Sequence, residues 1–176
     1  MTHREAFRVP KENSMKPQKR PHVLYVEDDE DSCQMMSILL GMSDIDVVFA
    51  HGIEKTMELP DKNQFDLFLI DQWMTDGSGT DLCRILRREF PEIPVVFYTG
   101  CATLQERKNG MLSGAAAYLV KPHSELVAPI VLRLVNGADL PVVLGRQANA
   151  LQILENNATR LVQIMTGSER PLPLSP

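Results

Sequence analysis

Short apolar runs alternate with segments of helical periodicity between residues 22 and 135. Five of these runs, rich in β-branched and other apolar residues, predict β-strands at 22–26, 46–50, 65–70, 94–99 and 117–120. Between and after them, apolar residues recur every three or four positions and predict helices at 32–42, 53–59, 79–90, 103–114 and 124–135. The last of these helices contains Pro129 at an awkward interior position.

The five apolar runs lack the polar alternation of half-exposed strands, which indicates strands buried on both faces. Strands that alternate with helices require right-handed crossovers and a parallel sheet. The pattern therefore predicts one α/β domain over residues 22–136, built on a five-stranded parallel sheet with helices on both sides.

The carboxyl ends of the predicted strands carry the candidate chemistry, and ligands bind at this edge in parallel α/β sheets. The groups found there are Glu27, Asp28 and Asp29 after the first strand, Asp71 after the third, Thr99 at the end of the fourth, and Lys121 after the fifth. Taken singly, an acidic run is usually a helix cap or a solvated turn, and a lone lysine is usually exposed. Their joint occurrence at one edge predicts a functional site.

These residue types favour phosphoryl chemistry. Clustered carboxylates repel one another unless a hard divalent cation joins them, and Mg²⁺ prefers oxygen ligands. Asp71 is a candidate nucleophile because carboxylates form aspartyl-phosphates. Lys121 can balance the phosphoryl charge, while the Thr99 hydroxyl and the glycine-rich backbone after Asp71 can donate to phosphoryl oxygens.

Four stretches, "VLYVEDDE", "DLFLIDQWMTDGSG", "VVFYTG" and "AAAYLVKP", resemble the receiver domain of bacterial two-component response regulators in order and spacing. The resemblance spans about residues 22–136. It implies a flavodoxin-like, doubly wound sheet with strand order 2-1-3-4-5, as in stand-alone, CheY-like receivers.

The resemblance also implies a role for each matching residue. Asp71 corresponds to the phosphoacceptor. Glu27 and Asp28 correspond to the acidic pair that holds Mg²⁺ together with Asp71 and the backbone carbonyl of Trp73. Asp29 falls one place later and is expected to be a helix cap or an outer partner.

Three further positions match the family's switch. Thr99 corresponds to the hydroxyl that is drawn toward the phosphoryl group, and Tyr118 to the aromatic residue that turns inward when Thr99 moves. Lys121 pairs with the phosphate, and Pro122 follows it where the family often has a cis peptide bond.

The sequence departs from the family near the phosphoacceptor. The family commonly has proline four residues after it, and here that residue is Thr75, which predicts a looser or differently shaped turn with no direct chemical role. Trp73 is the only tryptophan, and its side chain either shields an acyl-phosphate from water or forms a partner contact at the surface. Cys101 is expected to serve as a small neutral side chain near the site rather than a redox group.

The charge along the chain is uneven. Residues 1–20 carry six Lys or Arg and two Glu, a net charge of +4, which leaves −9 for the remainder of a chain whose total is −5. Residues 1–21 are predicted to be a basic, solvated and disordered tail. An acidic body does not bind nucleic-acid backbones well, so we expect no direct nucleic-acid partner.

The cysteines and the termini bear on location. Cys33, Cys83 and Cys101 lack CxxC spacing and paired histidines, which argues against a zinc site or a disulfide framework and for reduced thiols in the cytoplasm. The N-terminus has no apolar segment of the kind found in secretory signals, and no apolar stretch is long enough to cross a bilayer. We therefore expect a cytoplasmic protein without a membrane partner.

Residues 137–176 form a predicted C-terminal extension with no net charge. An apolar stripe predicts an amphipathic helix at 146–165, followed by a disordered end. This helix either folds back on the receiver or pairs with its twin, and we favour a homodimer because the receiver should be complete without it. The extension is too short for a winged-helix output domain, so we expect a protein target at the family's usual output face, about 103–135.

The leading interpretation is a phosphorylation-switched signalling module that receives its phosphoryl group from a histidine kinase or a phosphotransfer protein, and not a turnover enzyme. One alternative is a constitutive adaptor with a vestigial site, against which the intact set of Asp71, Thr99 and Lys121 argues. Another is an aspartate-nucleophile phosphatase of the haloacid-dehalogenase type. Such enzymes carry a second aspartate two residues after the nucleophile, and here that residue is Trp73.

Overall fold

A five-stranded parallel sheet forms the centre of the computed structural model, which describes residues 19–101 and 103–138. Its strands are β1 (His22–Val26), β2 (Asp46–Ala50), β3 (Leu67–Ile70), β6 (Val95–Thr99) and β7 (Ala117–Val120). They are ordered β2-β1-β3-β6-β7, and every neighbouring pair is parallel. This is the predicted order 2-1-3-4-5, so the predicted fold is confirmed.

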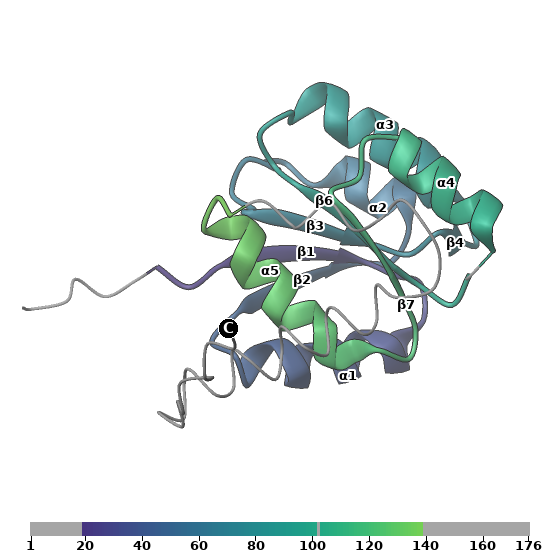
Figure 1. The fold of residues 1–176 in the computed structure, drawn as a ribbon. Helices are drawn as coiled ribbons and strands as arrows, with labels where there is room; N and C mark the ends of the chain where they lie inside the picture. Colours follow the sequence, from purple (N-terminus) through teal and green to yellow (C-terminus); the bar gives the residue numbers. More distant parts are fainter. Residues whose placement is uncertain (1–18, 102, 139–176) are drawn as a thin grey trace, which may run out of the picture.

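Helices cover both faces of the sheet (Figure 1). They are α1 (Glu30–Gly41), α2 (Ile53–Glu58), α3 (Gly79–Glu89), α4 (Leu104–Leu112) and α5 (Val127–Val135), the last preceded by a 3-10 turn at Ser124–Leu126. α1 and α5 lie on one face, and α2, α3 and α4 lie on the other (Figure 1). The domain is therefore doubly wound.

Two apolar cores result, one on each side of the sheet. Side chains of α1 and α5, such as Met36 and Ile130, pack on one face, and side chains of α3, such as Leu82 and Leu86, pack on the other. All four residues of β3 and all five of β6 are buried, as the lack of polar alternation predicted. The prediction is wrong for β2, which lies at the edge of the sheet, where Asp46 is exposed and the next three residues are half-buried. The two central strands are thus fixed rigidly, and the residues at their carboxyl ends with them.

Two helix details follow from local chemistry. The Asp29 side chain accepts a hydrogen bond from the Ser32 N–H and caps α1, as predicted for this residue. Pro129 is the third residue of α5, where the backbone N–H has no partner within the helix. The predicted helix over 124–135 therefore divides into a short turn and a helix that tolerates its proline.

The segment after Asp71 contains two short strands where the sequence predicted a turn. β4 (Trp73–Met74) and β5 (Gly77–Ser78) form an antiparallel hairpin. The hairpin returns the chain to β3, where Gly79 opens α3. A Cβ atom on Gly79 would lie 2.0 Å from the Asp71 carbonyl oxygen, so this close approach requires glycine.

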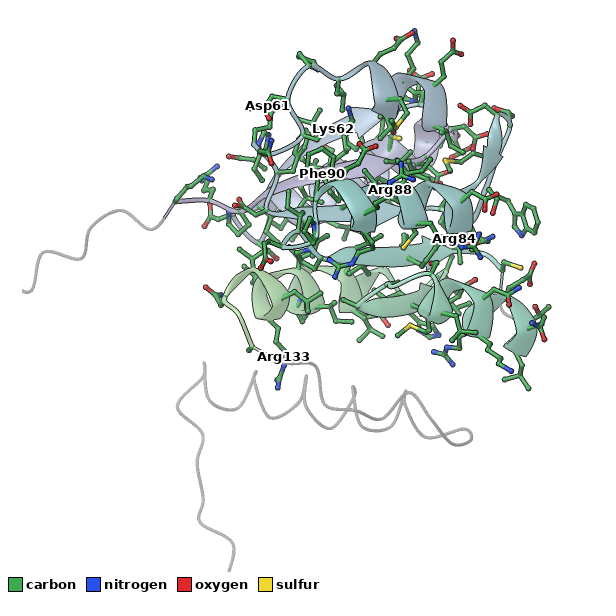
Figure 2. All side chains as sticks on the ribbon, turned by 90° about the horizontal axis from the view of Figure 1, so that it is seen from above. Asp61, Lys62, Arg84, Arg88, Phe90 and Arg133 are labelled. Atoms are coloured by element: carbon green, nitrogen blue, oxygen red, sulfur yellow. The ribbon has the colours of Figure 1, made fainter. Side chains whose placement is uncertain are left out.

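Charged side chains cover the outer surface of the domain. Along α3, Arg84 and Arg88 point into solvent, and Phe90 follows toward the amino ends of the strands, where Asp61 also lies (Figure 2). Lys62 beside it is buried instead, and its ammonium donates to the carbonyls of Met57 and Leu59. The described residues include no helix that could span a bilayer. The predicted 146–165 helix, the disordered end and most of the predicted tail lie outside the described residues.

Candidate functional site

Asp71 lies directly after β3 and is 8% exposed. Its N–H donates to the Val26 carbonyl (3.0 Å), which ties the end of β3 to the end of β1. Its Oδ1 atom accepts hydrogen bonds from the N–H groups of Gln72 (2.5 Å) and Trp73 (3.4 Å). The carboxylate is thus held by the backbone of the residues that follow it.

The glycine-rich backbone after Asp71 folds into the β4–β5 hairpin. The N–H of Gly79 donates to the Gln72 carbonyl at 2.8 Å and closes the hairpin. The physical reason is the return of the chain through β4 and β5, which uses the glycines for close packing. Gln72 and Trp73 present their N–H groups to the Asp71 carboxylate, and donation by this backbone to phosphoryl oxygens stays a prediction.

Lys121 follows β7 and brings two of the predicted carboxylates together. Its Nζ atom lies 2.5 Å from Glu27 Oε2 and 3.0 Å from Asp71 Oδ2, so residues 94 and 50 positions away in sequence meet at one ammonium group. Burial lowers the pKa of Lys121, but hydrogen bonds and charge from Glu27 and Asp71 outweigh it and leave the pKa raised. The Lys121–Pro122 peptide bond is cis, as the resemblance implied.

Glu27 is 2% exposed and is surrounded by donors. Besides Lys121, the Tyr25 hydroxyl donates to Oε2 at 2.7 Å, and the Asp29 N–H donates to Oε1 at 3.3 Å. Burial, followed by the charge of Glu27, raises the pKa of Tyr25. The Tyr25 hydroxyl therefore stays protonated and remains a donor to the buried carboxylate.

Asp28 is half-buried and accepts a hydrogen bond from a residue on another loop of the site. Its Oδ2 atom accepts a hydrogen bond from the Thr75 N–H at 2.8 Å, which joins the β1–α1 loop to the β4–β5 turn. A proline at this position has no N–H and could not make the bond. The departure from the family at Thr75 thus adds a contact to a predicted metal ligand, which the sequence analysis did not foresee.

The two predicted switch residues lie on neighbouring strands and are both buried. The Thr99 hydroxyl accepts the Cys101 N–H at 3.2 Å. Tyr118 is 1% exposed, its ring lies 5.2 Å from that of Phe97, and its hydroxyl donates to the Cys101 carbonyl at 3.0 Å. Burial, with the charges nearby, raises the pKa of Tyr118 to about 12. The structure therefore describes the inward position of this aromatic residue.

Trp73 lies at the rim of the site, with 58% of its surface exposed. Its indole N–H donates to Glu106 Oε1 of α4 at 3.1 Å. The other oxygen of Glu106 accepts the Cys101 thiol and the Thr103 hydroxyl, and these bonds, with that of Trp73, lower the pKa of Glu106. A contact thus joins the loop after Asp71 to the start of α4, and no sequence signal links residues 33 positions apart.

The donor set at this edge consists of oxygen atoms and fits a hard divalent cation. Glu27, Asp28 and Asp71 supply carboxylates, and the Trp73 carbonyl stays a predicted ligand. In the described part of the chain, no three acidic, histidine or cysteine side chains are already gathered around one point. The Lys121 ammonium lies between Glu27 and Asp71 and supplies the positive charge that the two carboxylates require. A cation bound beside Glu27 and Asp71 would also balance the negative charge of these carboxylates.

Comparisons with known proteins agree on the family. The family model described as the response regulator receiver domain matches residues 23–130. The response regulator protein PilR of Pseudomonas aeruginosa is 30% identical over 165 residues, which are 89% of this chain and 36% of PilR. The transcriptional regulatory protein CpxR of Escherichia coli is 34% identical over 110 residues, which are 61% of this chain and 47% of CpxR. The chain thus spans less than half the length of these two relatives.

Solved structures of receiver domains share this fold, and the match covers nearly the full length of each of them. The non-phosphorylated receiver domain of HemR from Leptospira biflexa is 31% identical with a TM-score of 0.59, over 73% of this chain and 99% of that one. The receiver domain of the Francisella response regulator 1452 is 26% identical with a TM-score of 0.62, over 67% of this chain and 98% of that one. This chain belongs to the family of response regulator receiver domains.

Proposed function

We propose that Asp71 accepts a phosphoryl group from a phosphohistidine of a histidine kinase or a phosphotransfer protein. A carboxylate oxygen of Asp71 attacks phosphorus, the phosphorus–nitrogen bond breaks, and the imidazole keeps the bonding electron pair. The observation that carries the proposal is the contact of Asp71 with the Lys121 ammonium and with two backbone N–H groups, at the mouth of a buried sheet. These groups stabilise negative charge where it accumulates during transfer.

The other residues of the site have supporting roles in this proposal. Glu27, Asp28, Asp71 and the Trp73 carbonyl hold Mg²⁺, as receiver domains typically do at their acidic site. Mg²⁺ held by these residues would supply positive charge to the phosphoryl oxygens. Lys121 contacts Asp71 before transfer and pairs with the phosphoryl group after it. The chain is a phosphoacceptor that takes part in its own phosphorylation, and it has no turnover reaction of its own.

Output follows from a shift between two states of the domain. In this proposal the Thr99 hydroxyl moves toward the phosphoryl group, and the buried position of Tyr118 becomes more populated. Tyr118 packs beneath α4, and its carbonyl oxygen accepts a hydrogen bond from Arg107 of that helix. A protein target then binds the face formed by α4, β7 and α5, or a second copy of the chain binds there. We place this signalling in the cytoplasm.

Control of transcription is a second candidate output. CpxR and the phosphate regulon regulator PhoB are named as transcriptional regulators, and the aligned part of this chain is only 47% and 67% of their lengths. The acidic character of residues 21–176 favours a protein target over direct nucleic-acid contact at this domain. The alternative is a constitutive adaptor, whose output does not depend on Asp71. An experiment must distinguish it from a phosphorylation switch.

Beryllofluoride, which resembles a phosphoryl group on a carboxylate, tests the switch without a kinase. The emission of Trp73, the only tryptophan, reports on the site. We expect beryllofluoride to change this emission when Mg²⁺ is present, and to have no effect with EDTA or in Asp71→Asn. An Asp81→Asn variant on the exposed side of α3 should respond like the wild type. An emission that beryllofluoride leaves unchanged under all conditions would favour the constitutive adaptor.

A further inference from the structure

Two tyrosines on the same side of the sheet differ in what their hydroxyl groups contact. Tyr25 on β1 and Tyr98 on β6 are both fully buried and belong to the same apolar core. The Tyr25 hydroxyl donates to Glu27 Oε2 at 2.7 Å. Among the described residues, no carboxylate of the site receives a hydrogen bond from Tyr98. Of these two tyrosines, Tyr25 is therefore the one whose hydroxyl donates to a carboxylate of the site, whereas the ring of Tyr98 lies 5.6 Å from Lys121 Nζ.

Glu27 needs a donor that stays in place. Its Oε2 atom accepts both Tyr25 and Lys121, and Lys121 also contacts Asp71. A phosphoryl group or a cation at Asp71 changes the charge that Lys121 meets, so this ammonium is a movable partner. A carboxylate that is 2% exposed is costly when it loses a donor, because little water can replace it. The Tyr25 side chain is buried on β1, and its hydroxyl donates to Glu27 and not to Asp71.

We propose that Tyr25 is a positioning residue of the cation site, which holds the Glu27 carboxylate in its metal-binding orientation while Lys121 moves. This inference rests on the proposed function, since it requires Mg²⁺ at Glu27, Asp28 and Asp71. Residues that hydrogen-bond to metal ligands commonly change metal affinity by 10–100-fold when they are removed. A hydroxyl outside the ligand set therefore contributes to affinity without touching the ion.

Magnesium titration of matched variants tests the proposal. The dissociation constant is measured by calorimetry on the full chain, and Trp73 emission gives a second reading. We expect Tyr25→Phe to weaken Mg²⁺ binding about tenfold, because the substitution keeps the ring and removes only the donor. Tyr98→Phe removes an equally buried hydroxyl and should bind Mg²⁺ like the wild type. Urea unfolding of both variants checks that each remains folded.

A double-mutant comparison shows whether Tyr25 acts through Glu27. Glu27→Gln alone should weaken binding, and Tyr25→Phe should have little further effect in that background. If Tyr25→Phe binds Mg²⁺ as tightly as Tyr98→Phe, or weakens binding equally with and without Glu27, the positioning role is wrong. If the wild type itself binds no Mg²⁺, the proposed cation site fails, and the role of Tyr25 fails with it.

Discussion

Trp73 has two interpretations, a shield of the site or a partner contact, and one contact in the structure favours the first. Its indole N–H donates to Glu106 on α4, so the side chain joins the loop after Asp71 to the start of that helix. A ring held at both ends restricts water more than one that moves freely, although 58% of its surface remains exposed. In the shielding hypothesis Glu106 therefore anchors the Trp73 ring, and a substitution of Glu106 alone tests this anchor.

Removal of the ring or of its anchor should shorten the lifetime of the phosphorylated state. We expect Trp73→Ala to speed dephosphorylation roughly threefold, a change of about 0.7 kcal/mol in the barrier, and Glu106→Ala to act in the same direction. Gln105→Ala is the control, because Gln105 is exposed on α4 and bonds only Asn109 among the described residues. Loss of phosphoryl is followed by intact mass after the donor is removed. An unchanged rate in Trp73→Ala would leave Trp73 as a partner contact.

At the scale of elements, Gly110 allows α4 to pack closely on the buried ring of Tyr118. A Cβ atom on Gly110 would lie 2.8 Å from the Tyr118 ring and 3.2 Å from Phe97. The helix can therefore approach β7 only because this side chain is absent. The packing couples the position of α4 to that of the aromatic residue beneath it, which is what an output face requires.

An added methyl group at this contact should destabilise the domain. We expect Gly110→Ala to lower the free energy of unfolding by about 1–2 kcal/mol, although alanine favours a helix over glycine by about 1 kcal/mol. Gly41→Ala is the matched control, because Gly41 ends α1 with no atom within 4 Å of its Cβ position. Its stability should be unchanged or higher. Urea denaturation measures both, and equal stability of the two variants would contradict the packing argument.

Sequence reasoning found the residues that a pattern marks and missed those that only the fold brings together. Asp71, Thr99 and Lys121 end predicted strands, so their meeting at one edge followed from parallel topology. The β4–β5 hairpin was missed because two-residue strands are too short for any periodicity. Tyr25 lies two residues before Glu27, and residues at that spacing on a strand share a face, so a signal for this pair was present.

The contacts made by backbone N–H groups were harder to foresee. Thr75 was interpreted through the proline that it replaces, and the sequence gives no sign that its N–H meets Asp28, 47 residues away. Glu106 carried no signal either, because an exposed glutamate on a helix is ordinary. Such contacts depend on how loops close around the site.

At the scale of the whole molecule, cation binding and folding are linked. The site draws on the ends of β1, β3 and β7, which come together only in the folded sheet. A cation that binds the folded state alone must therefore stabilise the entire domain. The carboxylates of the site act in the same direction, because a bound cation reduces the repulsion among them.

Removal of Mg²⁺ should therefore lower stability in the wild type. At a free Mg²⁺ concentration ten times the dissociation constant, we expect a gain of about 1.4 kcal/mol in the free energy of unfolding over EDTA. Asp71→Asn should gain less, because it lacks one charged ligand. Thermal unfolding with and without the ion measures both. An equal gain in the two proteins would place the cation away from Asp71.

The most direct test of the central claim is intact mass after incubation with Mg²⁺ and acetyl phosphate. We predict one phosphoryl adduct on the wild type, none on Asp71→Asn, and an adduct on Asp76→Asn, whose side chain instead accepts the Glu54 N–H at α2. Candidate histidine kinases serve as donors in parallel. An adduct that persists in Asp71→Asn, or no adduct with any of these donors, would contradict the assignment of Asp71 as the phosphoacceptor.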